Sequence, residues 1–407
     1  MALIVKRLGH RGDGVTEEGI FASRTLPGEV VEGEVDGGRI AVPRIVTPSP
    51  DRVRPPCAHY RGCGGCALQH ATDAFVTAWK EEVLRRALAG AGLHPEFLPP
   101  HVSPAGSRRR ATLAGRRTKG GALVGFHGRG SETLVAVPDC RLLHRDLMAA
   151  LPALEAVTRL GASRKAELSL AVTRSQDGPD VFVRGGKSLD AVLRAELAAC
   201  AAEHGIARLT WEDETIALRH PPRQIMGRAQ VVPPPGAFLQ ATEDGEAALI
   251  AAVRLALGSG ESAPGRIADL FAGCGTFALP LAEAAEVHAV EGDSAMLAAL
   301  DAGWRGSLGL KRVSTQARDL FRRPLLASEL AGFDAVVIDP PRAGAAAQIA
   351  ELARSDVSVI AHVSCNPATF ARDAGTLKAA GFRLDWVQLV DQFRWSTHLE
   401  LAARLVR

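Results

Sequence analysis

Hydrophobic and polar residues alternate at the start of the chain in the manner of short β-strands. Residues 1–46 contain four such stretches, ALIVKRL, GIFASRT, EVVEGEV and RIAVPRIV, with Gly- and Asp-rich turns between them. Alternation gives each strand one buried face and one exposed face. Several short strands joined by tight turns are typical of a small barrel. The pattern therefore predicts an all-β, barrel-like module over residues 1–46.

The pattern of the middle region is mixed. Residues 71–92 and 191–205 repeat apolar positions at helical spacing, whereas residues 108–137 alternate as strands do. Pro-rich stretches lie at both ends of this region, where turns and linkers are expected. We therefore predict a central α+β domain over residues 47–235. Cys200 lies on the second of these helices and is predicted to be a core residue.

From residue 236 the pattern changes to short apolar strands that alternate with helices. The strands are RIADLF, EVHAVEG, FDAVVI and SVIAHVSC, and two more, LDWVQLVDQF and HLELAARLV, close the chain. This alternation indicates a parallel sheet with helices on both faces. We therefore predict an α/β fold for residues 236–407, with a doubly wound and mostly parallel sheet. Ligands of such sheets bind beyond the carboxyl ends of the strands.

Length and composition indicate an ordinary globular protein of several domains. The chain has 407 residues, of which 47% are hydrophobic and 23% are charged, as in ordinary globular proteins. A single core stops growing at roughly 250–300 residues, so several domains are expected. No uninterrupted apolar run reaches the roughly 18 residues of a membrane span, and no secretory signal is visible. We expect a monomeric, cytoplasmic protein without a membrane partner.

The net charge of +3 is small, but its distribution is uneven. Residues 104–145 contain nine Lys or Arg and two acids, so this segment alone carries +7. A basic segment on a slightly acidic body is expected where a protein binds the phosphate backbone of a nucleic acid. A solvated charged surface would give the same pattern, and charge alone does not decide between the two.

Three of the seven cysteines crowd into one Gly-rich loop. Cys57, Cys63 and Cys66 lie within PPCAHYRGCGGC, and Cys140 follows 74 residues later. Such spacing brings three thiolates around one centre, and a fourth cysteine from a distant segment completes a four-thiolate site. A site of this kind holds zinc or an iron–sulfur cluster, and spacing alone does not decide between them. A set of buried structural thiols is the alternative.

A Gly-rich turn follows the first predicted strand of the C-terminal region. In DLFAGCGT, residues 269–276, Gly273 and Gly275 allow tight turning and the close approach of a ligand. Glu291 ends the next strand, where an acid accepts hydrogen bonds from ribose hydroxyls. The loop is neither a P-loop nor a full G-x-G-x-x-G sequence. It favours an adenosine ligand without a pyrophosphate, such as S-adenosylmethionine, over NAD, and a plain sheet turn is the alternative.

Three further polar groups lie at strand ends of the same region. Asp339 is held by prolines in DPPR, Cys365 lies in the Pro-braced loop SCNP, and Glu400 begins an apolar strand. A cysteine at a strand end is well placed to act as a nucleophile if its thiolate is stabilised. A solitary carboxylate in an apolar strand is costly unless it is used or paired. A lone cysteine such as Cys365 is more often an inert core thiol than a nucleophile. A lone glutamate such as Glu400 is more often a surface acid than a catalytic group.

Taken together, these segments resemble the bacterial RNA uracil-C5 methyltransferase family over nearly the whole chain. The similarity rests on PPCAHYRGCGGCALQH with a distant PDC, FLQ, DLFAGCGTF, VEG, IDPPR, VSCNPATFARD and VDQF…THLE. The N-terminal module, with GDGV, LPGE and VTPSPDR, looks like a TRAM domain, an RNA-binding barrel of the OB type. The resemblance implies a C-terminal Rossmann-like class I methyltransferase domain that uses S-adenosylmethionine.

The resemblance also implies roles for the residues that match the family's motifs. Cys365 aligns with the nucleophile and Glu400 with the general base. The positions implied to contact the cofactor are Gln240, Phe271, Gly273, Gly275, Thr276, Glu291, Asp319 and Asp339. The positions expected to contact the uridine are Phe238, Gln240 and Asp339. The implied ligands of a [4Fe–4S] cluster are Cys57, Cys63, Cys66 and Cys140.

The chain departs from the family pattern at three places. Thr276 stands where the family usually has Asn. Residues 393–395 read Phe-Arg-Trp instead of the usual Phe-Pro-His, and an Asn expected near residues 304–306 is missing. These departures leave the thiolate chemistry intact and concern the contacts of the cofactor and the choice of RNA.

The implied reaction is methylation of carbon 5 of a specific uridine in structured RNA. A barrel together with a cluster resembles the 23S rRNA branch of the family more than the tRNA branch. A tRNA enzyme and a catalytically inactive RNA-binding relative are the alternatives. A cytosine-C5 methyltransferase is disfavoured because its Pro-Cys motif is absent, and a radical enzyme because its C-x₃-C-x₂-C spacing is not found.

Overall fold

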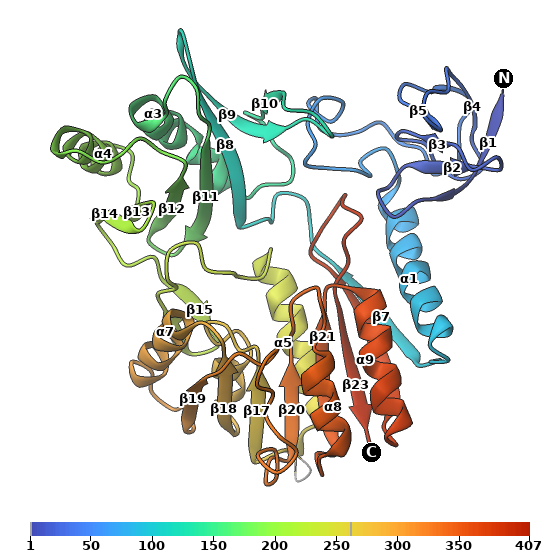
Figure 1. Ribbon diagram of the computed structural model, residues 1–407, viewed down its shortest axis with the longest axis vertical. Coiled ribbons are helices and arrows are strands. Elements are labelled where there is room, and N and C mark those ends of the chain that lie inside the picture. The colour runs from blue at the N-terminus through green and yellow to red at the C-terminus, as the bar shows by residue number, and fades with distance from the viewer. Residues whose placement is uncertain (1, 261–262) are drawn as a thin grey trace.

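The computed structural model describes residues 2–260 and 263–407, which form three sheet-based units (Figure 1). The N-terminal unit is a six-stranded sheet in the order β5-β3-β2-β1-β4-β6. Its strands are β1 Leu3–Leu8, β2 Gly14–Thr16, β3 Phe21–Ala22, β4 Val30–Glu32, β5 Arg39–Ile40 and β6 Arg44–Thr47. Along β1, Leu3 and Val5 are buried and Ile4 is exposed, as the alternation predicts. The sheet curls around this small core, consistent with the predicted barrel.

The middle unit is built on a seven-stranded sheet in the order β10-β9-β8-β11-β12-β13-β14. Its strands are β8 Arg110–Thr118, β9 Gly121–His127, β10 Leu134–Ala136, β11 Leu168–Ser175, β12 Gly178–Arg184, β13 Arg208–Trp211 and β14 Glu214–Leu218. Its helices are α2 Arg145–Ala149, α3 Leu151–Gly161 and α4 Ala191–Glu203. Trp211 is buried against Gly161 and Gly186, where any side chain would overlap the indole ring. Cys200 is buried in the same core, as predicted.

The C-terminal unit contains an eight-stranded sheet in the order β19-β18-β17-β20-β21-β23-β22-β7. Its strands are β17 Arg266–Leu270, β18 Glu286–Glu291, β19 Val313–Ala317, β20 Ala335–Ile338, β21 Val359–Ser364, β22 Arg383–Asp391, β23 Leu401–Val406 and β7 Glu96–Val102. All neighbouring strands from β19 to β21 pair in parallel, and β23 is antiparallel to both of its neighbours. The doubly wound, mostly parallel sheet is therefore confirmed. The hairpin of β15 Gln224–Met226 and β16 Ala229–Val231 precedes it.

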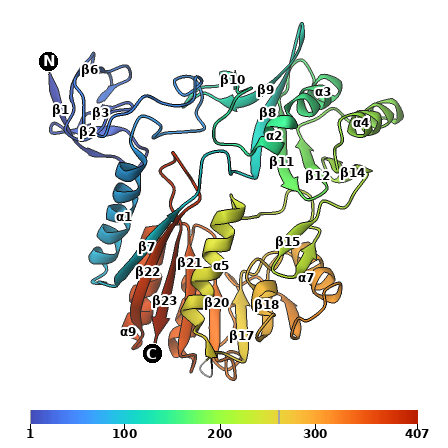
Figure 2. The same ribbon diagram turned by 180° about the vertical axis from the view of Figure 1, so that it is seen from behind.

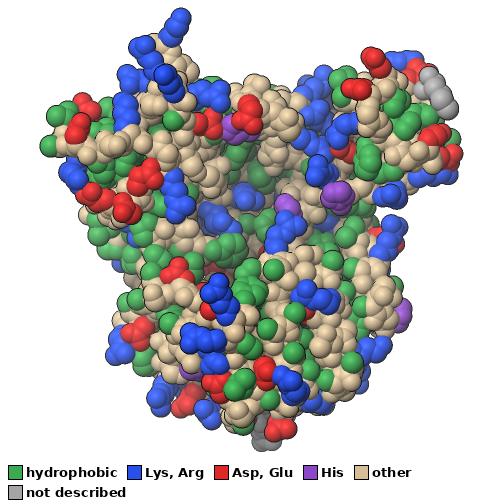
Figure 3. Space-filling model, in the orientation of Figure 1, with side chains coloured by type: hydrophobic (Ala, Val, Ile, Leu, Met, Phe, Trp, Pro, Cys, Tyr) green, Lys and Arg blue, Asp and Glu red, His purple; other side chains and the backbone are tan. Residues whose placement is uncertain are grey.

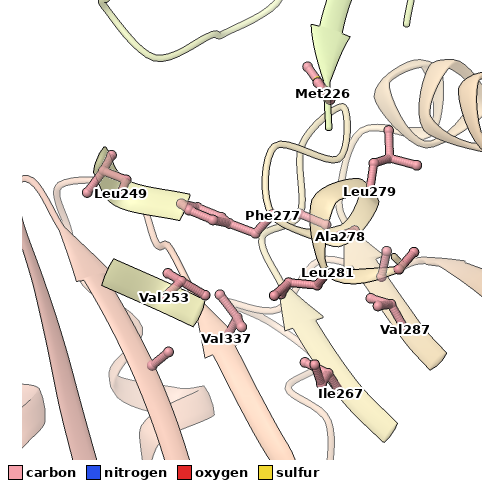
Figure 4. Close-up of a cluster of buried hydrophobic side chains, with 14 of the residues drawn as sticks. Met226, Leu249, Val253, Ile267, Phe277, Ala278, Leu279, Leu281, Val287 and Val337 are labelled. Carbon is pink, nitrogen blue, oxygen red and sulfur yellow. The ribbon is translucent and has the colours of Figure 1, made fainter. Parts of the chain in front are cut away.

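Helices cover both faces of this sheet. They are α5 Glu243–Leu257, α6 Ala278–Leu281, α7 Ser294–Arg305, α8 Ala346–Arg354 and α9 Pro367–Ala379. Helices α8 and α9 lie in front of the sheet in Figure 1, and α5 lies in front of it in the view from behind (Figure 2). Leu249 and Val253 of α5 pack with Phe277, Ile267 and Val337 in the core beneath α5 (Figure 4). No helix among the described residues is both long and apolar enough to cross a membrane.

Helix α1, Asp73–Gly90, and strand β7 pack with the C-terminal unit, although they lie early in the chain. β7 pairs in parallel with β22, and α1 packs against α9 and β22. Lys80 of α1 is buried and donates to both carboxylate oxygens of Asp391 at 2.7 Å. These two elements lie within the predicted central domain of residues 47–235 but pack with the C-terminal unit, because the local sequence pattern does not reveal which sheet edge a strand joins.

Buried charges fix the N-terminal unit against the middle unit. Asp13 is buried and accepts from Arg129 Nη1 at 2.6 Å and from Arg39 Nη2 at 2.5 Å. Arg129 belongs to the loop between β9 and β10, so this carboxylate bridges the two units. A buried carboxylate is costly unless it is paired in this way.

Candidate active site

Several loops of the C-terminal sheet converge at one edge. The carboxyl ends of β17, β18, β20 and β21 lie at that edge because these strands are parallel. Strand β23 runs antiparallel to β21, so it begins where the others end. The register pairs Ser364 with Leu401. Cys365 follows Ser364 and Glu400 precedes Leu401, so the continuation of this register sets the two predicted catalytic residues opposite each other.

Cys365 lies between β21 and α9 and is half buried. Its loop is held by Asn366, which caps α9 and donates from Nδ2 to the carbonyl oxygen of Arg342 at 2.9 Å. Burial raises the pKa of the Cys365 thiol to about 11. The charges of Glu400 and Asp339 raise it too, whereas Arg342 lowers it. The thiol is therefore neutral in this arrangement, and a thiolate requires the carboxylate charges to be countered.

Glu400 is a buried carboxyl group directly before β23. Its pKa is raised to about 8, first by burial and then by the charge of Asp339. A hydrogen bond from Gln392 and the charge of Arg110 act in the opposite direction. A carboxyl group that titrates near neutral pH can take up and release a proton during a reaction, as a general base must.

Asp339 follows β20 at the same edge. Desolvation raises its pKa to about 7, while Gln240 Nε2 donates to its Oδ2 at 3.2 Å and favours the charged form. Asp269, at the end of β17, is fully buried nearby, and burial followed by the charge of Asp339 raises its pKa well above the usual range. The edge of the sheet thus holds three acids whose ionisation is coupled.

Gln392 connects the two carboxyl groups and was not among the predicted site residues. Its Oε1 accepts from Ala241 N at 2.6 Å and from Thr242 N at 3.4 Å. Its Nε2 donates to Gln240 Oε1 at 2.6 Å and to Glu400 Oε2. The signal in the sequence is its place in the motif VDQF, directly after Asp391, the last residue of β22.

Phe271, Gly273 and Gly275 shape the loop after β17. Their φ angles are 63°, 55° and 98°, a region that favours glycine. A side chain on Gly275 would lie 2.9 Å from Leu279 and Leu300, whereas the position beside Gly273 is open. Glycine at positions 273 and 275 therefore permits the turn, and the space beside Gly273 can admit a ligand. Thr276 is half buried in the same turn.

Two acids at neighbouring strand ends hold loop amides in place. Glu291 Oε2 accepts from Gly273 N at 3.0 Å, and Oε1 accepts from Asp293 N at 3.0 Å. Asp319 Oδ1 accepts from Phe321 N at 3.0 Å. Glu291 thereby ties the end of β18 to the Gly-rich loop, where the ribose of an adenosine ligand is expected.

Phe321 adds an aromatic wall that was not predicted. Its ring packs against Phe271 with centroids 5.4 Å apart and planes tilted by 56°, and the residue is 48% exposed. An exposed ring beside an adenosine site offers a flat apolar surface for a base. The sequence implied a role only for Asp319, two residues earlier.

Phe238 and Arg110 form the side of the site that faces the middle unit. The guanidinium of Arg110 lies 4.4 Å from the centroid of the Phe238 ring, and Phe238 is 55% exposed. Burial lowers the pKa of Arg110 to about 10, so it stays charged at neutral pH, and the charge of Glu400 favours this state. An exposed aromatic ring beside a cation suits stacking on a nucleobase.

A cavity of about 1370 Å³ joins this edge of the sheet to the other two units. Cys365 and His398 line it from the C-terminal unit, and His10 lines it from the N-terminal unit. Figure 3 shows Lys and Arg side chains gathered around the hollow between the upper and lower parts of the molecule. The arginines that line the cavity are Arg11, Arg24, Arg39, Arg108, Arg129, Arg342 and Arg394. A concave surface with this charge suits a polyanion.

The four predicted cluster ligands line the same cavity. They are Cys57, Cys63, Cys66 and Cys140. The pKa of Cys66 is raised to about 12 by burial and by the charges of the other three cysteines. Gly65 N donates to Cys63 Sγ at 3.3 Å. Within the described residues no three His, Cys, Asp or Glu side chains form a metal-binding group, so the cluster stays a prediction that rests on the thiol chemistry of these four residues and on their shared cavity.

The unusual residues of the loop before β23 have a structural role. Trp395 has a left-handed backbone conformation, with φ of 58°, and its carbonyl oxygen accepts from Ala67 N at 2.8 Å and Leu68 N at 3.0 Å. Arg394 pairs with Asp73 of α1. These contacts join the loop that precedes Glu400 to the segment that follows the cysteine loop.

Comparisons with known proteins agree with one another. Residues 247–407 match the protein family described as tRNA (Uracil-5-)-methyltransferase. The chain is 45% identical to an uncharacterized RNA methyltransferase of Caulobacter vibrioides, over 100% of this chain and 99% of that protein. It is 34% identical to the 23S rRNA (uracil(1939)-C(5))-methyltransferase RlmD of Chromohalobacter salexigens, over 100% of this chain and 89% of that protein.

A solved structure shares the fold. The tRNA (uracil-54, C5)-methyltransferase of Pyrococcus abyssi, in complex with S-adenosyl-L-homocysteine, superposes with a TM-score of 0.77. The match covers 100% of this chain and 99% of that one at 23% identity. The predicted class I methyltransferase fold of the C-terminal unit is therefore confirmed.

Proposed function

We propose that this protein methylates a specific uridine of 23S rRNA. The chain belongs to the S-adenosylmethionine-dependent RNA uracil-C5 methyltransferase family, and the proposal proceeds from that membership. The observation that carries the proposed chemistry is the placement of Cys365 opposite Glu400 at the edge of the C-terminal sheet. The full-length identity of 34% with a 23S rRNA enzyme supports the choice of RNA.

Cys365 is the proposed nucleophile. Its thiolate adds to carbon 6 of uracil, which forms a C6–S bond and turns carbon 5 into a nucleophile. S-adenosylmethionine, when bound, supplies the electrophilic methyl group that carbon 5 requires. Arg342 is the nearby cation that lowers the pKa of the Cys365 thiol and so favours the thiolate.

Glu400 is the proposed general base. It removes the hydrogen on carbon 5 as a proton after that carbon has been methylated. The electrons of the C5–H bond restore the C5–C6 double bond, the C6–S bond breaks, and its electrons remain on Cys365. Because Glu400 titrates near neutral pH, with a pKa of about 8, its ionised form is a stronger base than an ordinary carboxylate.

The adenosine side of the site consists of the Gly-rich loop and the acids around it. Glu291 is placed to accept hydrogen bonds from the ribose, and the open position beside Gly273 leaves room for the ligand. The residues proposed to hold S-adenosylmethionine are Gln240, Phe271, Gly273, Gly275, Thr276, Glu291, Asp319 and Asp339.

The RNA side consists of the arginine-lined cavity and the aromatic ring of Phe238. The target uridine has to leave its stack to reach Cys365, which costs a few kcal/mol. Stacking on Phe238 offsets part of this cost, and the arginines neutralise phosphates of the flanking nucleotides. Gln240 and Asp339 are proposed to face both the uracil and the cofactor.

The four cavity cysteines are proposed to ligate a [4Fe–4S] cluster with a structural or RNA-positioning role. Their support is the shared cavity, the mutual effect of their charges, and the amide N–H directed at Cys63. Anaerobically purified protein should contain iron and lose it in Cys57→Ser, whereas Cys200→Ser in the middle core should retain it. Stoichiometric zinc without iron would contradict the cluster.

Methylation of unmodified transcripts tests the proposed activity. With S-adenosylmethionine labelled in its methyl group, a 23S rRNA transcript should acquire label as 5-methyluridine at one position, and a tRNA transcript should not. Label in tRNA alone would move the target to tRNA. If the folded protein binds S-adenosylmethionine but labels neither RNA, the protein is instead an RNA-binding relative without catalytic activity.

A further inference from the structure

The orientation of the Gln392 side chain is fixed by the backbone around it. Its Oε1 faces two backbone N–H groups, those of Ala241 at 2.6 Å and Thr242 at 3.4 Å. A backbone N–H only donates, so the atom that faces both has to be the amide oxygen. The assignment of oxygen and nitrogen, which is often ambiguous for Gln, therefore follows from the contacts.

The fixed amide directs its hydrogens toward the active site. Gln392 Nε2 donates to Glu400 Oε2 and to Gln240 Oε1, the second at 2.6 Å. Because Gln240 uses its oxygen in this contact, its own amide nitrogen faces Asp339 Oδ2 at 3.2 Å. Gln392, Gln240 and Glu400 are all buried, so water does not replace these bonds easily.

We propose that Gln392 is a positioning residue for proton removal, holding Oε2 of Glu400 so that Oε1 takes the proton from carbon 5 of the methylated uracil. This inference rests on the proposed role of Glu400. A hydrogen bond from an N–H group stabilises the charge on Oε2 and makes that oxygen less basic, so the proton goes to Oε1 in preference. The C5–H bond breaks toward Oε1, the C5–C6 double bond forms, and the C6–S bond leaves its electrons on Cys365.

The groups that face Glu400 come from four elements. Asp339 follows β20, Cys365 follows β21, Gln392 follows β22, and Arg110 begins β8. The charge of Asp339 disfavours the ionised form of Glu400, whereas Arg110 and Gln392 favour it. Gln392 is the member of this set whose hydrogen bond fixes one carboxylate oxygen. It therefore sets both the orientation of Glu400 and part of its basicity.

A purely structural role is the competing explanation, because Gln392 also accepts from the backbone N–H groups of Ala241 and Thr242. Two substitutions separate the explanations. Gln392→Glu keeps an oxygen for both backbone groups and replaces the donor nitrogen by an acceptor. Gln392→Met keeps the length of the side chain and removes both functions. If Gln392 only held the loop, the Glu variant would behave like the wild type.

A timed single-turnover reaction separates the two steps that matter. The RNA is the unmodified transcript, 23S rRNA or tRNA, that the enzyme methylates, and denaturing gels report covalent adduct formation and decay. In Gln392→Glu we expect the adduct to form at the wild-type rate. Its decay at neutral pH should slow by roughly tenfold or more, since each pKa unit changes the ionised fraction of Glu400 by a factor of ten.

The pH dependence of adduct decay distinguishes the two explanations, because a purely structural role of Gln392 would leave its midpoint unchanged. In Gln392→Glu the midpoint of the decay rate should shift upward, because an acceptor in place of a donor disfavours ionised Glu400. Gln392→Met should shift it in the same direction by less. Gln388 lies on β22, the strand that Gln392 follows, and donates to Pro99 O at 2.9 Å. Gln388→Glu and Gln388→Met are therefore matched controls and should decay like the wild type.

The outcomes distinguish this inference from the proposed function. An unchanged decay rate and midpoint in folded Gln392→Glu would overturn the inference. Failure of both Gln392 variants to fold, judged by unfolding and by S-adenosylhomocysteine binding, would also overturn it, since the role would then be structural. Glu400→Gln, run in parallel, should accumulate adduct. If Glu400→Gln turned over normally, the proposed base itself would be wrong, whatever the Gln392 variants do.

Discussion

Asp339 and Glu400 place two desolvated carboxyl groups at one edge of the sheet, and the charge of Asp339 raises the pKa of Glu400. Their pKa values lie at about 7 and about 8. Neighbouring carboxyl groups in a desolvated site lose their protons one after the other rather than together. The site therefore changes its proton content within the range where an enzyme works.

This relationship predicts a pH dependence for the release of the product. Adduct decay should become faster as the pH rises through about 8, because only ionised Glu400 can accept the proton from carbon 5. Asp339→Asn removes the like charge, so the midpoint should move to lower pH. Single-turnover decay rates at saturating S-adenosylmethionine, measured across the pH range, check both statements. A midpoint that stays in place in Asp339→Asn would contradict the coupling.

The buried ion pair between α1 and β22 predicts a large effect on stability. Lys80 Nζ donates to both oxygens of Asp391 at 2.7 Å and to Phe393 O at 3.2 Å. Lys80→Met should lower the free energy of unfolding by about 3–5 kcal/mol, because it leaves a buried carboxylate without its partner. Adding Asp391→Leu should recover most of this loss. Urea unfolding measures both.

An exposed pair on the same helix is the control for this prediction. Arg86 and Glu82 pair on the surface of α1. Arg86→Met should change the free energy of unfolding by less than about 1 kcal/mol, since exposed ion pairs contribute little. Equal losses for Arg86→Met and Lys80→Met would show that burial of the Lys80 pair does not matter.

The proposed role of Glu291 in the adenosine site predicts that removal of its side chain lowers the affinity for the cofactor. Glu291→Ala should weaken the binding of S-adenosylmethionine by about 1.5–3 kcal/mol, the range for hydrogen bonds to a charged group. Calorimetry measures this directly. Glu286 lies at the opposite end of the same strand, so Glu286→Ala should bind normally. Unchanged affinity in Glu291→Ala would count against the ribose contact.

Substitutions of two exposed phenylalanines should have opposite effects on the binding of RNA and of the cofactor. Phe238 and Phe321 are 55% and 48% exposed, and they lie on the RNA side and the adenosine side. Phe238→Ala should weaken RNA binding by about 1–3 kcal/mol, the range for base stacking on an aromatic ring. Its affinity for S-adenosylmethionine should stay unchanged. Phe321→Ala should show the reverse pattern, and equal RNA affinities for both variants would contradict the assignment of Phe238.

Part of the site could be predicted from the sequence because strand ends are visible in it. Asp339 and Cys365 each follow an apolar run, and the carboxyl ends of parallel strands meet at one edge. Glu400 is harder to place, because it precedes a strand instead of following one. It reaches the same edge only because β23 is antiparallel to β21. The pattern of apolar residues does not reveal the direction of a strand.

Other features depend on contacts that spacing does not reveal. Gln392 bonds to Ala241, which lies 151 residues away. Arg110 was counted only as part of a basic segment, whereas its guanidinium stacks on Phe238 and faces Glu400. Strand β7, EFLPPHV, contains two prolines and no clear alternation, and it pairs with β22 of the C-terminal sheet. In each case tertiary packing selects one partner among many that the local pattern allows.

The central claim is that Cys365 forms a covalent bond with the target uridine and that Glu400 resolves it. The most direct test is a denaturing gel of labelled RNA after incubation with S-adenosylmethionine. Wild type should form a stable complex with RNA that carries 5-fluorouridine at the target, because fluorine cannot leave as a cation. Glu400→Gln should form one with normal RNA.

The cysteine variants decide the outcome of this gel. Cys365→Ala should give neither adduct nor product, and the buried core variant Cys200→Ala should behave like the wild type. A complex between Cys365→Ala and the fluorinated RNA, or methylation of normal RNA by Cys365→Ala at an undiminished rate, would contradict the claim.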